Sequence, residues 1–501
     1  MIEVEVHSSL RDFLREQDRE NWPHHLTMAR LVARALRLCR PALIQTGSSV
    51  GKYCLSYLMP ALVGDWSVII VAPEKVQSYL IKDFIPALQT WLGTQKNVRI
   101  GECWANTDHL LLTTPQIWLR ARFNQSEAFP HHIPTIIDCA DDLEDLVRQE
   151  LTVNLNRYDW EELSQNIPEY AELIREFRIK LTKAIFSRPA NPYECYLLEP
   201  SEQDNLFQLL QTLAKRQLLT PKLAQFWQQW QQPHPILWAA IAINRGEISL
   251  HTVPAEIASI LSPIWQQQPI VLIGSFLDLE ANAPIYRQQL GIGEILSLKF
   301  SPNRQNEPIN LYLPDRFPLP NTPQFRQALI EQSRILVNLS SQVNQPVVIL
   351  IDDVPLKAQV GTFLAAEFGS RVRVEQTNLA MDGILISGWE FWCNNQTQLP
   401  IPQLLIIATL PLPSLEHPLV ASRVAYYKSQ RQDWFRLYLL PSALRRIQQA
   451  ILPLRESQGV VALLDNRVNY RSYGKTILTA LEPCPRINYI DPTWFKLAIS
   501  E

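Results

Sequence analysis

The stretch ALIQTGSSVGKYCLSYLMPAL, residues 42–62, carries the strongest indication of the fold. It opens with a short apolar run at 42–44, passes through small and polar residues, and continues as an apolar helical pattern at 54–62. A loop of small residues between a strand and a helix lets backbone N–H groups surround a phosphate. Gly51 and Lys52 fit the end of the phosphate-loop pattern G-x-x-x-x-G-K-[ST], whereas Thr46 replaces its first glycine and Tyr53 its hydroxyl residue.

Further apolar runs repeat the strand signal along the chain. Each is continuous rather than alternating, which is typical of strands buried on both faces. Helical patterns separate most of them, so the sequence predicts an α/β fold with parallel sheets in two groups. The runs lie at residues 68–72, 110–112, 135–137, 270–273, 347–351, 384–386, 404–407 and 460–464.

The segment from about 145 to 245 has a different character. Apolar residues recur at helical spacing in 169–186 and again in 204–216. Thr220 and Pro221 are typical of a helix start, and a Gln- and Trp-rich helix follows to about residue 232. The pattern predicts a helical insert within an α/β protein.

Composition excludes several classes of protein. The chain has 501 residues, 47% of them hydrophobic and 19% charged, and a formal net charge of -3, which is ordinary for a globular protein. No apolar run reaches the roughly 20 residues of a membrane helix, and the charged N-terminus lacks a signal core. Seven cysteines without a CxxC pair favour free thiols in a reducing compartment. We expect a cytoplasmic protein with no membrane partner.

A second chemical motif lies at residues 134–141, PTIIDCAD. A strand that ends in an aspartate is the usual partner of a phosphate loop, because the carboxylate orients hydrated Mg²⁺. Asp138 is therefore the candidate metal ligand, although an aspartate that caps the next helix is at least as common. Cys139 stands where a glutamate would activate water, and a thiol cannot act as a carboxylate base.

With both motifs in view, the chain resembles the DinG/XPD-type DNA helicases of superfamily 2, from about Trp22 to Leu481. GKYCLSYLMPAL (51–62) is similar to the family's GKS-x-x-YLLPAL. FWCNNQ (391–396) and LLIIATLPLPSLEHPLVASR (404–423) are similar to its FWEGVD and to the segment that follows. The resemblance implies two RecA-like P-loop domains. Domain 1 would comprise residues 1–142 and 243–300, with a helical, arch-like insert at 143–242, and domain 2 would comprise 301–501.

The departures from the family concern the residues of hydrolysis. The DEAH box becomes DCAD at 138–141, so its Glu and His are absent. The family's TSATL becomes IGSFL at 273–277, and His25 replaces the adenine-region Gln. Leu452 occupies the place of the arginine finger, between Gln448 and Arg455. Only Cys103 lies between residues 75 and 138, so the four-thiolate iron–sulfur cluster of many members is not expected.

The resemblance also implies a nucleotide site, in which weak ATP and Mg²⁺ binding is expected. Its residues would be Thr46, Gly47, Ser48, Ser49, Val50, Gly51, Lys52, Gln448 and Arg455, with Asp138 toward the metal.

Three functions stay open at this point. The first is a helicase-fold protein that binds single-stranded or damaged DNA without efficient hydrolysis. The second is an active ATP-dependent helicase in which Asp141 or Asp142 replaces the glutamate, and the third is a non-enzymatic scaffold. Nucleic acid is favoured by a group of arginines and aromatics, although a solvated amphipathic helix explains it equally well. The group comprises Arg431, Arg436, Arg445, Arg446 and Arg455, with Trp434, Phe435 and Tyr438.

Overall fold

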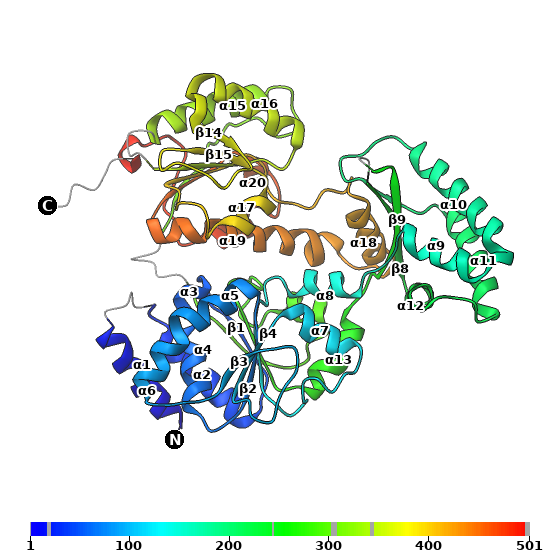
Figure 1. The fold of residues 1–501 in the computed structure, drawn as a ribbon. Helices are drawn as coiled ribbons and strands as arrows, with labels where there is room; N and C mark the ends of the chain where they lie inside the picture. Colours follow the sequence, from blue (N-terminus) through cyan, green and yellow to red (C-terminus); the bar gives the residue numbers. More distant parts are fainter. Residues whose placement is uncertain (1, 18–21, 243–244, 302–307, 341–344, 496–501) are drawn as a thin grey trace.

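The computed structural model describes residues 2–17, 22–242, 245–301, 308–340 and 345–495. Figure 1 shows two α/β domains, one above the other, and a smaller body that projects beside them. The lower body is domain 1, the upper one is domain 2, and the projecting body is the insert. The predicted α/β class with two sheet domains is confirmed.

Domain 1 is built on a seven-stranded parallel sheet with the order β11-β1-β10-β5-β2-β4-β3. Its central strands are buried along their whole length, as the continuous apolar runs predict. The strands are β1 Ala42–Gln45, β2 Val68–Val71, β3 Val98–Ile100, β4 Leu110–Thr113, β5 Thr135–Asp138, β10 Ile270–Gly274 and β11 Leu296–Lys299.

Helices cover both faces of this sheet, and two separate apolar cores lie between them and the strands. The helices are α1 Ile2–Glu16, α2 His25–Leu38, α3 Val50–Tyr53, α4 Leu55–Val63, α5 Glu74–Tyr79, α6 Ile85–Leu92, α7 Pro115–Phe123, α8 Leu143–Leu151, α13 Ala258–Gln267 and α14 Pro284–Leu290. Because all seven strands are parallel, their carboxyl ends share one edge, and that edge faces domain 2 (Figure 1).

Domain 2 repeats the architecture with the order β14-β15-β13-β16-β17-β12-β18, all parallel. Its strands are β12 Asn310–Tyr312, β13 Val347–Leu350, β14 Val372–Val374, β15 Ile384–Ser387, β16 Leu404–Ile407, β17 Val460–Leu463 and β18 Arg486–Ile487. Its helices are α15 Phe325–Ser340, α16 Val354–Phe368, α17 Trp389–Asn395, α18 Pro418–Ser429, α19 Leu440–Ser457, α20 Arg467–Tyr470 and α21 Gly474–Leu481. The long α19 lies along the side of domain 2 that faces domain 1 (Figure 1).

The insert is not purely helical, which corrects the sequence prediction. An antiparallel sheet with the order β6-β9-β8-β7 accompanies its four helices. Its elements are β6 Val153–Leu155, α9 Arg157–Asn166, α10 Ala171–Phe186, β7 Cys195–Leu197, α11 Pro200–Lys215, α12 Pro221–Trp230, β8 Pro235–Ala242 and β9 Glu247–Pro254. Residues 143–151 form α8, which packs in the core of domain 1, so the insert begins at about 153 and not at 143. The hairpin of β8 and β9 crosses the predicted boundary at residue 242, so the insert extends to about 254.

The side chains of β8 explain why this strand escaped prediction. Leu237, Ala239 and Ile241 point toward the insert's own helices. Ile236 and Trp238 point to the other face, where Leu419 and Tyr426 of α18 pack. Both faces are therefore buried, and a short apolar run buried on both faces cannot be distinguished from a helix by its periodicity.

Buried polar contacts tie domain 1 to domain 2 beside the insert. Glu144 of α8 accepts hydrogen bonds from Arg423 of α18 and, at 3.1 Å, from Arg148. The guanidinium of Arg423 also lies 3.8 Å from the ring centroid of Tyr438. Burial opposes ionisation of Glu144, but Arg423, Arg148 and a further arginine lower its pKa to about 2. The attraction of the arginines therefore outweighs the cost of burial. Glu144 stays ionised and links the two domains through its ion pair with Arg423.

Candidate nucleotide cleft

The loop from β1 to α3 forms as predicted and lies at the carboxyl edge of the sheet. Gly47 has a φ of 62°, a left-handed conformation that favours glycine. The amides of Thr46 and Gly47 donate to the carbonyls of Gly274 and Ser275, at 2.8 and 2.9 Å. The first two N–H groups of the loop therefore bind the end of β10. The amides of Ser48 and Lys52 also have acceptors, Thr46 Oγ1 at 3.4 Å and the Ser49 carbonyl at 3.0 Å, so these four amides do not face open space.

Asp138 ends β5, two strands away from β1, and it faces Tyr53 at the end of α3. The Tyr53 hydroxyl donates to Asp138 Oδ1 at 2.6 Å, and the Tyr57 hydroxyl donates to Oδ2 at 2.6 Å. All three side chains are buried, with Asp138 only 2% exposed. Tyr53 was recognisable from the sequence as a substitution, whereas Tyr57, four residues further on in α4, was not predicted to take part.

Burial determines the protonation states of Asp138, Tyr53 and Tyr57. Burial raises the pKa of Asp138 to about 6, even though the two tyrosine hydrogen bonds act to lower it. Burial, together with the charge of Asp138, holds the pKa of Tyr53 and Tyr57 well above the ordinary value of 10. Both tyrosines therefore stay protonated near pH 7 and act as hydrogen-bond donors to a carboxylate.

These residues do not fit a Mg²⁺ site. Mg²⁺ takes oxygen ligands in octahedral geometry and keeps several waters, so its ligands need open space around them. At Asp138 each carboxylate oxygen already accepts a hydroxyl, and two phenol rings fill the surrounding volume. Among the described residues, no group of three or more His, Cys, Asp or Glu side chains could hold a metal ion. The expectation that Asp138 is a metal ligand thus has no geometric support.

The residues at and beside the expected position of the catalytic base are buried or held by hydrogen bonds. Cys139 is buried, and burial raises the pKa of its thiol well above 9. Asp141 binds the β10 loop through three hydrogen bonds, from Ser275 N at 2.7 Å, Ser275 Oγ at 3.0 Å and Phe276 N at 2.8 Å. Asp141 therefore fixes a loop within domain 1, and it is not placed to orient water as a substitute glutamate.

One face of α19 meets domain 1. Arg445 Nη1 donates to the carbonyl of Asp141 at 3.1 Å, and Glu456 lies 3.4 Å from Lys52 Nζ and from Ser49 Oγ. Gln448 and Leu452 fall between these two residues at spacings of three and four, so they share the face. Among the described residues of domain 2, Glu456 therefore contacts the loop, and the sequence did not predict this contact.

Arg455 does not face the loop, which corrects the sequence prediction. Its guanidinium donates to the carbonyls of Leu481 and Glu482 at 3.0 Å, within domain 2. The side chain is 3% exposed. One residue along an α-helix rotates the side chain by about 100°, so Glu456 and Arg455 cannot both point into the cleft. The register of α19 therefore places the Glu456 carboxylate, and not the Arg455 guanidinium, in the cleft.

The ion pair of Glu456 and Lys52 is a weak obstacle to a nucleotide. The two side chains are 33% and 24% exposed, and pairs of this kind contribute about 1 kcal/mol or less. A nucleotide phosphate could therefore displace the carboxylate from Lys52. The hydrogen bonds from Tyr53 and Tyr57 to Asp138 are a stronger obstacle to a ligand of Asp138, because hydrogen bonds to a charged group contribute about 1.5–3 kcal/mol each.

Aromatic side chains fill the region next to the loop. The ring of Trp22 lies 5.2 Å from Phe300 and 6.4 Å from Tyr53, and His24 stacks on Phe300 at 4.6 Å. His25, expected in the adenine region, is buried, and its Nδ1 lies 2.9 Å from Ser56 Oγ. Burial lowers the pKa of His25 to about 4, so it is a neutral core residue.

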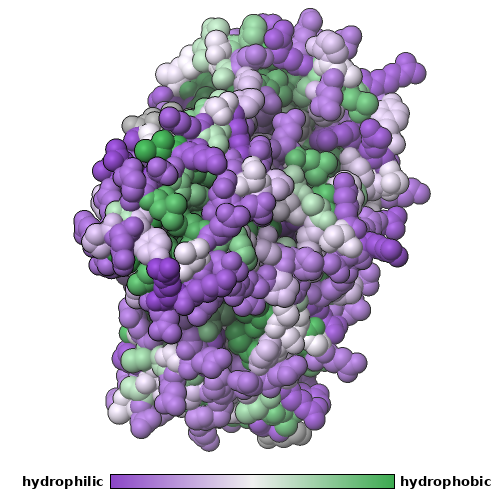
Figure 2. All heavy atoms as spheres, turned by 90° about the vertical axis from the view of Figure 1, so that its right-hand side faces the viewer, coloured by the Kyte–Doolittle hydropathy of each residue, from purple (hydrophilic) through white to green (hydrophobic). Residues whose placement is uncertain are grey.

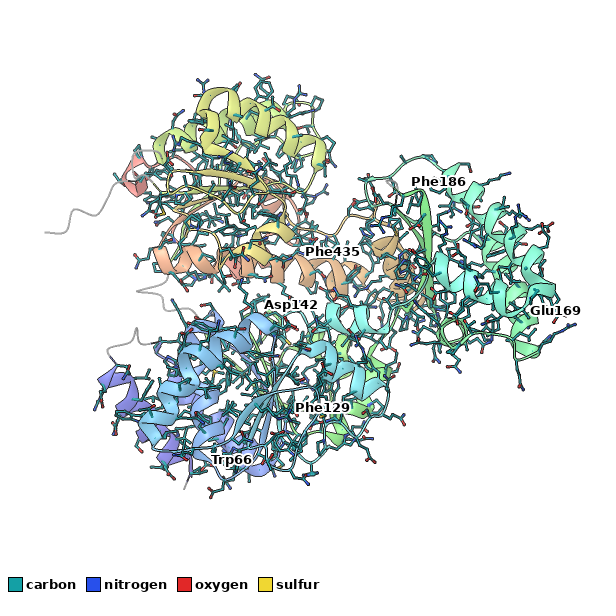
Figure 3. The ribbon with its side chains drawn as sticks, in the orientation of Figure 1. Trp66, Phe129, Asp142, Glu169, Phe186 and Phe435 are labelled. Carbon is teal, nitrogen blue, oxygen red and sulfur yellow. The ribbon has the colours of Figure 1, made fainter. Side chains whose placement is uncertain are left out.

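The structure divides the predicted arginine group into two sets. Arg445 and Arg455 are held by backbone carbonyls, and Tyr438 is buried beneath Arg423. Arg431, Arg436 and Arg446 are exposed, and Trp434 and Phe435 are half-buried beside them. Figure 3 places Phe435 on the edge of domain 2 that faces Asp142 of domain 1. The exposed arginines and the half-buried aromatic rings are therefore the members of this group that are available to a ligand.

Comparisons with known proteins agree with this architecture. Residues 401–484 match the helicase C-terminal domain family. Over 116 residues the chain is 30% identical to the ATP-dependent DNA helicase YoaA of Escherichia coli (strain K12), covering 23% of this chain and 18% of the relative. Over 254 residues it is 24% identical to YoaA of Haemophilus influenzae, covering 48% of this chain and 39% of the relative. The matches thus span less than half of these relatives.

Solved structures support the same fold over nearly the whole chain. An XPD helicase structure has a TM-score of 0.59 at 12% identity, covering 93% of this chain and all (100%) of that one. S. tokodaii Xpd4 has a TM-score of 0.59 at 15% identity, covering 93% of this chain and 99% of that one. The chain is therefore similar to DinG/XPD-type helicases, in sequence over part of its length and in fold over nearly all of it, and its two α/β domains match the RecA-like pair of the XPD structures.

Proposed function

We propose that this chain is a nucleic-acid-binding relative of the DinG/XPD-type helicases that does not turn over ATP. The single observation that carries the proposal is the contact of both Asp138 oxygens with the Tyr53 and Tyr57 hydroxyls. It puts two phenol rings where hydrated Mg²⁺ would be needed. Without the metal, the charge that develops during phosphoryl transfer has no counter-charge at this position.

Three losses act on the same chemical step. The metal position is filled by tyrosine, the base position holds the buried Cys139 thiol, and the arginine-finger position holds Leu452. A missing arginine finger alone lowers the rate by about 10³–10⁵-fold. The loop amides and Lys52 still supply contacts for bound phosphates, and those contacts need none of the missing groups. Nucleotide binding, where it occurs, is therefore uncoupled from hydrolysis.

The nucleic-acid surface is proposed along the exposed edge of domain 2. Arginines bind phosphates and aromatic rings stack on unpaired bases, which makes this edge suited to a single strand. Lys428 Nζ lies 5.3 Å from the Trp434 ring centroid, and the Phe435 and Tyr473 rings lie 5.0 Å apart. Viewed from the insert side, the surface is largely hydrophilic (Figure 2). No helix among the described residues could cross a membrane.

The proposal is tested with a labelled single-stranded oligonucleotide and fluorescence anisotropy over a range of salt concentrations. Each phosphate contact to a single strand contributes about 0.7 to the salt slope. The double variant Arg431→Gln/Arg446→Gln should therefore lower the slope by about 1.4. The matched control is Arg326→Gln/Arg334→Gln on α15, at the far side of domain 2 (Figure 1), and it should leave the slope unchanged.

ATP and Mg²⁺ should leave the dissociation constant for the strand unchanged within about threefold, about 0.65 kcal/mol. A tenfold change on adding ATP would contradict the proposal, because it would show that nucleotide state and strand affinity are still coupled. Absence of strand binding in the wild-type protein would also contradict it and would favour a scaffold.

A further inference from the structure

The proposed nucleic-acid edge and the joint between the domains belong to one continuous stretch of chain, residues 418–439, which we call the edge segment. It consists of α18, a loop at 430–434 and a π-helix, Phe435–Leu439. Arg431, Trp434 and Phe435, which would meet the strand, follow α18 directly, and α18 lies between α19 and the insert (Figure 1). Contacts that fix α18 therefore also fix where these three side chains lie.

The aromatic residues of the edge segment rest on a small apolar cluster. Val424, Tyr438 and Leu439 are its buried members, and Trp434 and Phe435 pack against them. A cluster with so few buried members stabilises its surroundings much less than the main cores of the two domains, since the stabilisation scales with the apolar area buried. Contacts outside the cluster therefore decide how firmly the edge segment is held.

Domain 1 holds the edge segment through two of its helices. Glu144 of α8 forms an ion pair with Arg423 of α18, and the two side chains are only 6% and 11% exposed. Gln289 of α14 donates through Nε2 to the carbonyl of Leu437 in the π-helix, at 2.6 Å. The guanidinium of Arg423 lies over the Tyr438 ring, so the ion pair is in direct contact with the aromatic cluster.

The insert also holds α18. Leu419 and Tyr426 of α18 pack against Trp238 of β8. The ring of His234, just before β8, lies 5.2 Å from the ring of Tyr426. The edge segment is therefore contacted by domain 1, by the insert and by the rest of domain 2.

A segment that is fixed before binding gives a higher affinity for a strand. Stacking of a base on an aromatic ring requires the ring in one position, and ordering a mobile side chain on binding lowers the affinity. Two side chains that must be ordered on binding lower it by about tenfold. Because Glu144 and Arg423 are almost completely buried, they would act through the edge segment and not by touching the strand.

We propose that Glu144 and Arg423 are positioning residues for strand binding, because their ion pair holds Arg431, Trp434 and Phe435 in place for a single strand. The inference rests on the function proposed above. It gives domain 1 a share in binding at a surface of domain 2. By reciprocity, a strand on this surface also favours the docked arrangement of the two domains.

Strand binding by Glu144→Gln separates positioning from simple electrostatics. Removing a carboxylate makes the protein less negative, so charge alone would tighten the binding of an anionic strand. Loss of the ion pair should instead weaken binding about tenfold, the equivalent of about 1.4 kcal/mol. No phosphate contact is removed, so the salt slope in the anisotropy titration should stay at the wild-type value, in contrast to Arg431→Gln/Arg446→Gln.

Two further variants and a control complete the titration. Arg423→Met should weaken binding as Glu144→Gln does. Gln289→Leu leaves the buried ion pair intact and removes one neutral hydrogen bond at a half-buried position, so it should fold like the wild type and weaken binding about threefold. Asp108→Asn is the matched control, because it breaks a buried pair with Arg99 within domain 1 and should leave affinity and slope unchanged.

Hydrogen–deuterium exchange of the free proteins gives a readout that needs no strand. Amides of residues 430–439 should exchange about tenfold faster in Glu144→Gln and Arg423→Met, because the edge segment opens more easily, and at the wild-type rate in Asp108→Asn. Unchanged exchange would overturn the inference. So would strand binding by Glu144→Gln and Arg423→Met that equals or exceeds that of the wild type, and this result would leave the proposed function standing. Absence of strand binding in the wild type would overturn both.

Discussion

Asp138→Asn should make the protein more stable at pH 8. The carboxyl has a pKa of about 6 in the folded protein, against an ordinary value of 3.8. Because the pKa is higher in the folded state, the contribution of this carboxyl to stability is fully present below pH 3.8. The contribution is lost as the pH rises from 3.8 through about 6. At about 1.36 kcal/mol per pKa unit, the loss at pH 8 is about 3 kcal/mol.

The asparagine removes this loss because it carries no charge to bury. Its amide also keeps hydrogen bonds to both tyrosines, since a hydroxyl can donate to the amide oxygen or accept from the amide nitrogen. The unfolding free energy should therefore rise by up to about 3 kcal/mol at pH 8. At pH 5 the two proteins should differ by about half as much.

Urea unfolding followed by tryptophan fluorescence at pH 5, 6.5 and 8 measures this difference. Asp108→Asn is a control that should lower the unfolding free energy at pH 8, because the hydrogen bond from Arg99 lowers the pKa of Asp108. An Asp138→Asn protein that is less stable than the wild type at pH 8 would refute the reasoning. It would show that the ionised carboxylate is a net stabilising group, as a metal ligand or as the partner of both tyrosines.

Three further changes follow from the same contacts. Tyr57→Phe should lower the unfolding free energy at pH 8 by about 1.5–3 kcal/mol, measured by urea unfolding, because it leaves one oxygen of Asp138 without a donor. Arg423→Met should cost about 3 kcal/mol at pH 7, and the wild type should lose this contribution as the pH falls from 4.5 toward 2, since the pKa of Glu144 is about 2; thermal unfolding at pH 7 and pH 3 measures both. Glu456→Gln should change stability by about 1 kcal/mol or less but raise affinity for ATP without Mg²⁺ in a binding titration, because the loop lysine no longer pairs with a carboxylate.

The sequence predicted the two sheets because their strands are continuous apolar runs between helical patterns. Residues 68–71, 110–113 and 135–138 form buried strands close to the predicted positions. The insert was predicted less well. Its sheet pairs segments as distant as residues 153–155 and 247–254, and each strand is buried against a different partner. Pairing over such distances leaves no local periodicity in the sequence.

The sequence predicted that the loop and Asp138 lie close together, but it did not predict which side chains contact each other there. The order of the loop and of Asp138 along the chain was enough to place them together, because parallel strands present their carboxyl ends at one edge. Which residue of α19 enters the cleft depends on the helix register, and a shift of one residue exchanges Arg455 for Glu456. The contact of the second tyrosine with Asp138 could not be predicted, because it depends on how α3 and α4 together turn Tyr53 and Tyr57 toward the end of β5.

ATP hydrolysis by the purified protein, with Mg²⁺ and a saturating single strand, tests the central claim most directly. We expect no strand-stimulated turnover in the wild type. We also expect none in the Cys139→Glu/Leu452→Arg double variant, which restores the base and the finger but leaves Tyr53 and Tyr57 on Asp138. Strand-stimulated hydrolysis by the wild type at about 1 s⁻¹ or faster, within the usual enzyme range, would contradict it.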